Sequence, residues 1–309
     1  MNNGQIIAGG STELVLKDVN VPLPQAEAEA FLRDTINMAT VLPKLKPYYK
    51  KAPAGNIDAL SVGKRKLREA SKDDTPTGTG SISSRQIPYA VKKVKWDEWI
   101  QNDDVWYAVA ARDQNVEDVI VDMIQEQFAT DLQDVIFNGD TAAGAGADQA
   151  FLKIIDGFVK KAKVSPNKTD LAANDVTIQA FVDHVAVLPD KYKTRKDIAW
   201  FITQKTHDKL MSLLTTRQTN LGDAVLIDGK VSKLAGYEVE IVQELQSGFA
   251  MLTPRDNLKP VFTRDVRYNR TAQGATAAAK DATYHILFAY LDCVIREVDA
   301  VAWMTGEKL

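Results

Sequence analysis

The sequence has little cysteine, little histidine and no long apolar run, and each shortage excludes a class of protein. The single Cys293 excludes a disulfide framework within the chain and any metal site built from several cysteines. The three histidines occur without an HExxH motif or a histidine-rich tract, so we expect neither a metal site nor a cofactor. No segment approaches the roughly 18 apolar residues of a membrane span, and no N-terminal signal pattern is present. We therefore expect a protein without a membrane partner, made and used in the cytosol or in a particle assembled there.

The composition is that of an ordinary folded protein. Of 309 residues, 45% are hydrophobic and 26% are charged, which is enough apolar material for a large core. The net charge of −3, from 38 basic and 41 acidic residues, predicts nothing special about partners. That small sum hides an uneven distribution.

Two segments of the chain carry large charges of opposite sign. Between residues 59 and 95 there are nine lysines and arginines against three acidic residues. Between residues 113 and 134 there is no lysine or arginine, but there are seven carboxylates: Asp113, Glu117, Asp118, Asp122, Glu126, Asp131 and Asp134. Segments of this kind indicate complementary partners.

The clearest predicted element is a helix over residues 115–137. Its apolar residues recur at intervals of three and four and form one face, made of Val116, Ile120, Met123, Ile124, Phe128, Leu132, Val135 and Ile136. Asn138-Gly139 is a typical helix stop. The acidic segment is therefore predicted on the solvent side of a long, straight helix.

The chain before this helix is predicted to form an arm and a projecting loop. Residues 1–24 are irregular, and a short helix is predicted from Pro24 to about Ala39. Strands predicted at 57–62 and 86–96 enclose the polar, turn-rich segment 71–84. Because this segment has no apolar face with which to pack on its own domain, it should project.

The chain after the helix alternates helices with strands, which predicts an α/β or α+β unit over about residues 175–256. Thr206 is the predicted cap of a helix that runs to Leu214. The other predicted elements are a helix at 175–188 and strands at 198–203, 237–242 and 249–253. A long strand at 284–296 follows and is predicted to lie along the long helix, so the middle unit would be an insertion.

Motifs of catalysis and phosphate binding are missing. The sequence has no G-x-S-x-G or other nucleophile motif, and the glycine-rich run 138–147 lacks the ending of a phosphate-binding loop. The basic segment has the charge of a nucleic-acid-binding surface, but only Tyr89 and Trp96 as aromatic residues. We therefore assign no catalytic, metal or cofactor-binding residue and predict that the basic loop pairs with the acidic helix.

This pairing is expected between copies of the chain, because a loop that projects from its own subunit cannot reach a helix of the same subunit. Head-to-tail contacts of this kind generate rings or extended arrays, in which many modest contacts become strong together. The hypothesis is that the cations of one subunit face the carboxylates of the next. The residues are Lys64, Arg65, Lys66 and Arg68 on the loop, and Glu117, Asp118, Asp122, Glu126 and Asp131 on the helix.

The order of these elements resembles the major capsid protein of tailed bacteriophages, which has the Hong Kong 97-type fold. The resemblance is carried by the long helix running into Phe137-Asn-Gly-Asp140, and by Trp200-Phe-Ile-Thr203 with the helix after it. Further on, it is carried by Leu234-Ala-Gly-Tyr-Glu-Val-Glu-Ile-Val242 and by the last long strand. It covers roughly residues 25–305, and its specificity lies in the order of the motifs.

The resemblance implies an α+β fold of four parts. These are an N-terminal arm with a short helix (1–56), an extended β-hairpin loop (57–96), a peripheral domain with a long spine helix and a β-ribbon (97–160 and 257–309), and an inserted axial α/β domain (161–256). It also implies self-assembly, as pentamers and hexamers, into the icosahedral virion shell that encloses double-stranded DNA without sequence-specific binding. The implied site of assembly is the host bacterial cytoplasm.

Further partners follow from the same resemblance. A separate scaffolding protein is implied because no long helical N-terminal extension is present, and a portal and a decoration protein are further partners. The nearest alternative is an encapsulin-like compartment shell with the same fold. An alternative of another class is a soluble α/β enzyme or a nucleic-acid-binding oligomer, which would form discrete species of low mass.

Overall fold

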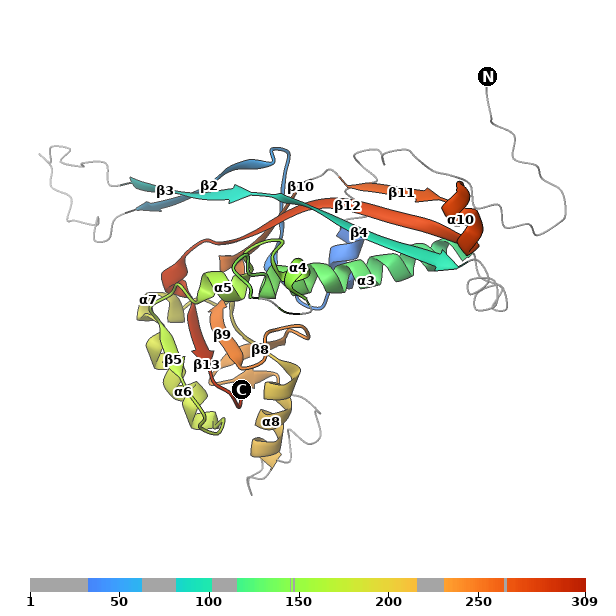
Figure 1. The fold of residues 1–309 in the computed structure, drawn as a ribbon. Coiled ribbons are helices and arrows are strands. Elements are labelled where there is room, and N and C mark those ends of the chain that lie inside the picture. The colour runs from blue at the N-terminus through green and yellow to red at the C-terminus, as the bar shows by residue number, and fades with distance from the viewer. Residues whose placement is uncertain are drawn as a thin grey trace, which may run out of the picture.

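A computed structural model shows two sheets, a two-stranded ribbon and one long helix (Figure 1). The structure describes residues 33–62, 82–101, 116–144, 146, 148–215, 231–263 and 266–309. The predicted loop segment 71–84 lies mostly outside these residues, as does the first part of the arm. None of the described helices has the length and apolar character needed to cross a membrane.

The first sheet joins five strands from distant parts of the chain. They are β1 (Tyr48–Lys50), β4 (Lys92–Gln101), β10 (Leu258–Thr263), β11 (Arg267–Thr271) and β12 (Ala282–Ile295). The central strand is β12, which confirms the long strand predicted at 284–296. The whole of β4 runs beside β12 in antiparallel register, from Ala282↔Gln101 to Leu291↔Lys92, and β10 and β11 also pair with β12. The short helix α10 (Ala275–Lys280) connects β11 to β12.

The long helix α3 (Val116–Asn138) runs along the first sheet (Figure 1), as the sequence predicts. Its buried residues Ile124, Phe128, Leu132, Val135 and Ile136 belong to the main core, together with Leu287 and Leu291 of β12. The sequence predicts Met123 on the same face, but its side chain is 63% exposed. Because each residue turns a helix by about 100°, the burial of Ile124 directs its neighbour towards solvent.

Two glycines allow the chain to return closely against the end of α3. After the helix, α4 (Gln149–Leu152) and α5 (Phe158–Ala162) fold back on it, and Gly157 N donates to Gly139 O at 2.7 Å. A Cβ atom on Gly157 would lie 2.6 Å from Phe137 O. The rings of Phe137 and Phe158 pack edge to face beside this crossing, with centroids 5.5 Å apart.

The end of the arm is part of the core. Residues 33–38 are helical, which agrees with the predicted short helix where it is described. The 3₁₀ turn η1 (Leu42–Leu45) follows, and β1 then pairs in parallel with β10. Ile36, Val41, Leu42 and Leu45 are buried in the main core, so apolar burial anchors this segment.

The ribbon consists of β2 (Ala54–Val62) and β3 (Ile82–Ala90), paired in antiparallel register from Ala54↔Ala90 to Val62↔Ile82. It leaves the body of the molecule as a separate arm of structure (Figure 1). The sequence predicts one strand over 86–96, but the structure divides this segment between β3 and β4. The division falls at Val91, whose N donates to Pro53 O at 2.9 Å, while Ala90 N donates to Asp292 Oδ2 at 2.9 Å.

The second sheet has six strands in the order β5-β13-β9-β6-β8-β7. Their bounds are β5 (Lys168–Asp170), β6 (Ile198–Ile202), β7 (Lys233–Leu234), β8 (Tyr237–Ile241), β9 (Phe249–Pro254) and β13 (Ala302–Thr305). The helices α6 (Ile178–Val187) and α8 (Gln204–Thr215) flank it, with the short α7 (Asp190–Lys193) between them in sequence (Figure 1).

Two details of the second sheet differ from the sequence predictions. The predicted peripheral segment 257–309 is divided, because β13 pairs with β9 and β5 and thus belongs to the second sheet. The short turn η4 (Val298–Ala300) separates β13 from β12. The cap of α8 is Thr203 rather than Thr206, since Thr203 Oγ1 accepts a hydrogen bond from Thr206 N at 3.0 Å.

Candidate functional site

The acidic face of α3 is present where its side chains are described. Asp122 and Glu126 are exposed, as is Met123, which lies between them in the sequence. Asp131 is half-buried, and burial raises its pKa despite a hydrogen bond from Gln127 Nε2 at 2.9 Å. Of the carboxylates predicted to face the basic loop of another copy, the structure thus describes two that are exposed and one that is half-buried.

The other predicted contact residues fall outside the described structure. Glu117 and Asp118 lie in the first turn of α3, but their side chains are not among those described. The four loop cations, Lys64, Arg65, Lys66 and Arg68, are also outside the described residues. The pairing of loop and helix therefore stays a prediction.

The C-terminal end of α3 is tied to the second sheet by polar contacts. Asn138 Nδ2 donates to Asp134 Oδ1 at 2.6 Å and also to Glu244 O, and Gln246 N donates to Asn138 Oδ1 at 2.8 Å. Burial raises the pKa of Asp134, with Glu244 as a further negative charge nearby. One asparagine side chain thereby joins the helix to the loop that follows β8.

The base of the ribbon is packed on the first sheet. Ile57, Ile87 and Tyr89 form a small apolar cluster with Val261 of β10 and Val294 of β12. Within the described residues, β2 and β3 pair with each other and with no further strand. The ribbon is thus fixed at one end, and the rest of it lies away from the core.

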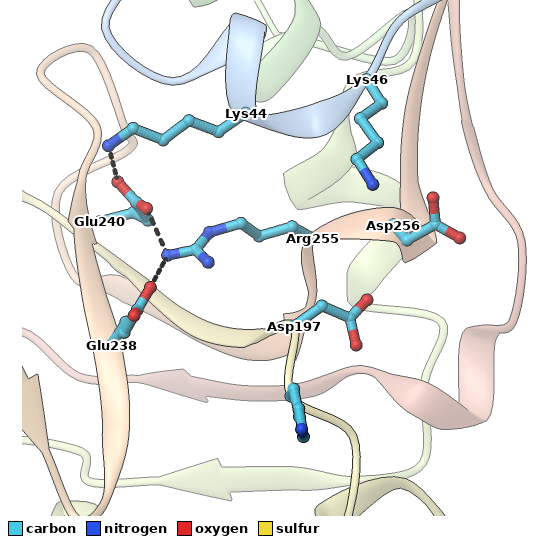
Figure 2. Close-up of a pocket in the computed structure, with 8 residues that line it drawn as sticks. Lys44, Lys46, Asp197, Glu238, Glu240, Arg255 and Asp256 are labelled. Atoms are coloured by element: carbon cyan, nitrogen blue, oxygen red, sulfur yellow. Dashed lines mark hydrogen bonds and ion pairs between the residues drawn. The ribbon is translucent and has the colours of Figure 1, made fainter.

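A charged cavity of about 570 Å³ lies where the arm, the second sheet and the link between the two sheets meet (Figure 2). All eight described residues that line it are charged: Lys44, Lys46, Lys196, Asp197, Glu238, Glu240, Arg255 and Asp256. Arg255 Nη2 lies 2.5 Å from a carboxylate oxygen of Glu238 and 2.5 Å from one of Glu240. Lys44 Nζ lies 2.5 Å from the other oxygen of Glu240.

The electrostatics of this cavity follow from these ion pairs. Burial alone would lower the pKa of Arg255, but the hydrogen bonds to Glu238 and Glu240 outweigh it and raise that pKa. The same contact with Arg255 lowers the pKa of Glu238. Arg255 and Glu238 therefore stay ionised near neutral pH, and their ion pairs make this cavity a structural junction between the second sheet and the turn that follows β9.

Sequence reasoning missed this junction, because no motif connects Lys44, Glu240 and Arg255. They come from η1, β8 and the turn η3 (Arg255–Asn257), which are far apart in the chain. The one local signal is that Glu238 and Glu240 alternate with apolar residues, which places both carboxylates on one face of a strand.

Each of the three histidines has a hydrogen-bond partner within the protein. His184 and His285 are buried, with Nδ1 2.7 Å from Thr169 Oγ1 and 2.6 Å from the Tyr268 hydroxyl, respectively. His207 Nε2 accepts a hydrogen bond from Val231 N at 3.0 Å. No cluster of potential metal ligands is found among the residues that the structure describes.

Burial of two histidines predicts a loss of stability in mild acid. Burial lowers the pKa of His184 and of His285 to about 4, from an ordinary value of 6.5. Their contribution is therefore complete above pH 6.5 and is lost as the pH falls towards about 4. The expected loss between pH 7 and pH 5.5 is about 1 kcal/mol per histidine in the free energy of urea unfolding. A variant with both histidines replaced by asparagine should lose this part of the pH dependence; an unchanged slope would contradict the assignment.

Comparison with known proteins identifies the family. Residues 108–306, well over half of the chain, match the model of the phage capsid family. The chain belongs to the phage capsid family. A relative over the full length of both chains is the putative prophage capsid protein YqbE of Bacillus subtilis strain 168, which is 23% identical over 334 residues.

Solved capsids share the fold of this family member. A chain of the satellite phage P4 procapsid that includes the size determination (Sid) protein has a TM-score of 0.62 at 13% identity, over 90% of this chain and 98% of that one. A chain of Microbacterium phage Oxtober96 has a TM-score of 0.57 at 12% identity, over 97% and 96% of the two chains. The predicted α+β, Hong Kong 97-type capsid fold is therefore confirmed.

Membership of the phage capsid family also confirms the predicted function as a structural protein of a phage shell, with the virion capsid as its location. The encapsulin-like alternative is not favoured, because both the family model and the prophage relative are phage capsid proteins. The family assignment likewise implies a structural role in place of the enzyme considered as an alternative.

Proposed function

We propose that copies of this capsid protein assemble, as pentamers and hexamers, into an icosahedral shell around double-stranded DNA in the host bacterial cytoplasm. The observation that carries the proposal is the ribbon β2–β3, which packs on the first sheet at its base and, as far as its residues are described, extends from the body (Figure 1). A two-stranded ribbon is marginal in water on its own, so its outer part requires a surface to lie on. In a shell, a neighbouring copy provides that surface.

The proposed contact places the loop that ends the ribbon over the spine helix of the next copy. Lys64, Arg65, Lys66 and Arg68 would then face Asp122 and Glu126, with Glu117, Asp118 and Asp131 close to them. One exposed ion pair contributes about 0–1 kcal/mol and is screened by salt. Repetition around a closed shell makes such small terms decisive for assembly.

Other partners belong to the same proposal. A scaffolding protein would direct assembly, a portal would occupy one vertex, and a decoration protein would bind the finished shell. The DNA would be enclosed without sequence-specific contacts. Support for such modest contact with DNA comes from the nearly balanced charge of the chain, −3 over 309 residues. The proposal includes no catalytic step.

Reversing the charge of the loop tests the proposed contact. Replacement of Lys64, Arg65, Lys66 and Arg68 by glutamate should abolish shells, because like charges would then face each other across the contact. Adding Asp122→Lys and Glu126→Lys should restore part of the yield. The measurement is negative-stain microscopy of protein expressed with its genomic neighbours, together with sedimentation.

Controls separate the proposed charge pairing from the proposed assembly into a shell. Lys153→Glu with Lys205→Glu reverses two exposed lysines outside the proposed contact, and should leave shells intact. Normal shells from the loop variant would contradict the charge pairing. Discrete small oligomers from the unaltered protein, even with scaffold present, would contradict assembly into a shell.

A further inference from the structure

The face that the second sheet turns towards α3 and α5 has two chemically different halves. Strands β13, β9 and β6 place apolar residues on it: Phe201, Phe249, Met251 and Trp303 belong to the same core cluster as Phe137 and Phe158. The next strand in the sheet, β8, places Glu238 opposite Ala199 and Glu240 opposite Phe201. Partners in register share a face, so this face changes from apolar to acidic within one strand spacing.

The turn η3 links the two sheets with two adjacent residues of opposite charge. Arg255 reaches the second sheet, where its guanidinium bonds Glu238 and Glu240 at 2.5 Å each. Asp256 reaches the first sheet, where it bonds Lys259 of β10 at 2.6 Å and Arg296, just after β12, at 2.7 Å. Ion pairs to both sheets thus converge on one short turn.

The arm closes the same junction from a third direction. In Figure 2, Lys44 extends from η1 to Glu240, while Arg255 reaches Glu240 from the opposite side. Lys44 and Glu238 are 50% and 55% exposed, whereas Arg255 and Glu240 are 21% and 7% exposed. We call Lys44, Glu238, Glu240 and Arg255 the charged seam.

The two halves differ in what separation would cost. Opening the apolar half would expose buried apolar side chains to water, which costs free energy in proportion to the area exposed. Opening the charged seam exchanges ion pairs for hydrated ions, and because burial of ions already carries a desolvation penalty, the net change is small. The cavity of about 570 Å³ beside the seam already gives water a place among these groups.

We propose that the charged seam opens and closes while the apolar half stays packed, so that the second sheet tilts relative to the first. The apolar half is the pivot, and η3 is the linker that follows the tilt. The motion itself is a property of one subunit. Its use rests on the proposed function, because pentamers and hexamers built from one chain need subunits that differ slightly in shape.

The distance between two spin labels reports this tilt. Val182→Cys on α6, which packs on the second sheet, and Met123→Cys on α3, which packs on the first, provide labelling sites with 43% and 63% exposure. The native Cys293 is fully buried, and burial raises the pKa of its thiol to about 12, so it stays unlabelled. The protein is the full chain, measured as unassembled subunits or as shells diluted with unlabelled copies.

The seam variant Glu238→Gln/Glu240→Gln should shift or broaden the distance distribution relative to unaltered seam residues. About 1 M salt, where the Debye length is about 3 Å, should move the unaltered seam in the same direction. Asp175→Asn is the matched control, because it removes an exposed ion pair to Lys308, 2.8 Å long, away from the seam, and should leave the distribution unchanged. Lys44→Met is a milder seam variant that retains both glutamates.

Hydrogen exchange of β6 and β9 identifies a variant that has simply lost its fold, because those amides should stay protected. A distribution that is the same in both seam variants and at high salt would overturn the proposal. The proposal would also be overturned if every variant with a changed distance distribution lost the hydrogen-exchange protection of β6 and β9, since the apolar half would then have opened. A failure to form shells, by contrast, would count against the proposed function and leave this measurement valid.

Discussion

Gly139→Ala is expected to destabilise the protein by about 3–5 kcal/mol, which is at the severe end for a single substitution. The new Cβ would lie 2.6 Å from Val135 O and still closer to Ile155 O. Both atoms belong to the backbone, so neither can move aside as a flexible side chain would. Relief would require α3 and the chain before α5 to separate, which would open the core around Phe137.

Urea unfolding of this variant should show the loss as a lower midpoint at an unchanged slope. Gly144→Ala provides the matched control, because a Cβ at Gly144 would meet no atom of the described residues within 4 Å. The control should stay within about 0.5 kcal/mol of the unaltered protein. Equal stabilities of the two variants would show that the crossing is looser than the structure indicates.

Asp256→Asn is expected to cost about 3 kcal/mol, because it leaves a buried ammonium without its counter-charge. Lys259 is only 2% exposed, and its Nζ lies 2.6 Å from Asp256 Oδ1. Two weaker contacts remain to it, namely Lys46 O at 3.4 Å and the Tyr48 ring, whose centroid is 5.0 Å away. These contacts limit the loss but do not supply a negative charge.

A second substitution tests whether the unpaired charge of Lys259 causes this loss of stability. Adding Lys259→Met should recover part of the stability, because an apolar side chain of similar length needs no counter-charge. Asp190→Asn is the control, since Asp190 is 94% exposed although it also pairs with a lysine, Lys193 at 2.7 Å. A double variant that is no more stable than Asp256→Asn would contradict the role assigned to the buried charge.

The pH dependence of this pair has a definite sign. Burial raises the pKa of Asp256, but the hydrogen bond from Lys259 outweighs burial, so the net pKa is below its ordinary value of 3.8. The ion pair therefore stabilises the fold fully above pH 3.8, and this part of the free energy of unfolding is lost as the pH falls below that value. This window lies below the one expected for the buried histidines, so the two losses should appear as separate steps in acid.

Elements with a strong repeating pattern could be predicted from the sequence. The spacing of Phe128, Leu132 and Val135 repeats often enough to indicate α3, and the long alternation in residues 284–296 indicates β12. The predicted ends of elements were wrong where a single tertiary or local hydrogen bond decides where a strand or helix begins or ends. Examples are the strand break at Val91, which depends on hydrogen bonds to Pro53 and Asp292, and the cap of α8.

The candidate sites divide in the same way. The acidic face of α3 could be predicted because a helix arranges nearby residues by a fixed rotation. The charged seam could not, because Lys44 and Glu240 meet only after the arm has folded against the second sheet, and no local period records that contact. The place of β13 in the second sheet is likewise set by pairing with β9 and β5, which are distant in sequence.

The positions of β12 and β13 also govern when during synthesis the subunit can form. Each is an interior strand of its sheet: β12 pairs with β4, β10 and β11, and β13 pairs with β5 and β9. Both come from residues 282–305, after every other described strand of the two sheets. Contacts of such long sequence separation form late and slowly. A growing chain on the ribosome thus lacks an interior strand of each sheet until residue 305 has been added, and only then can it present the surfaces on which other copies assemble.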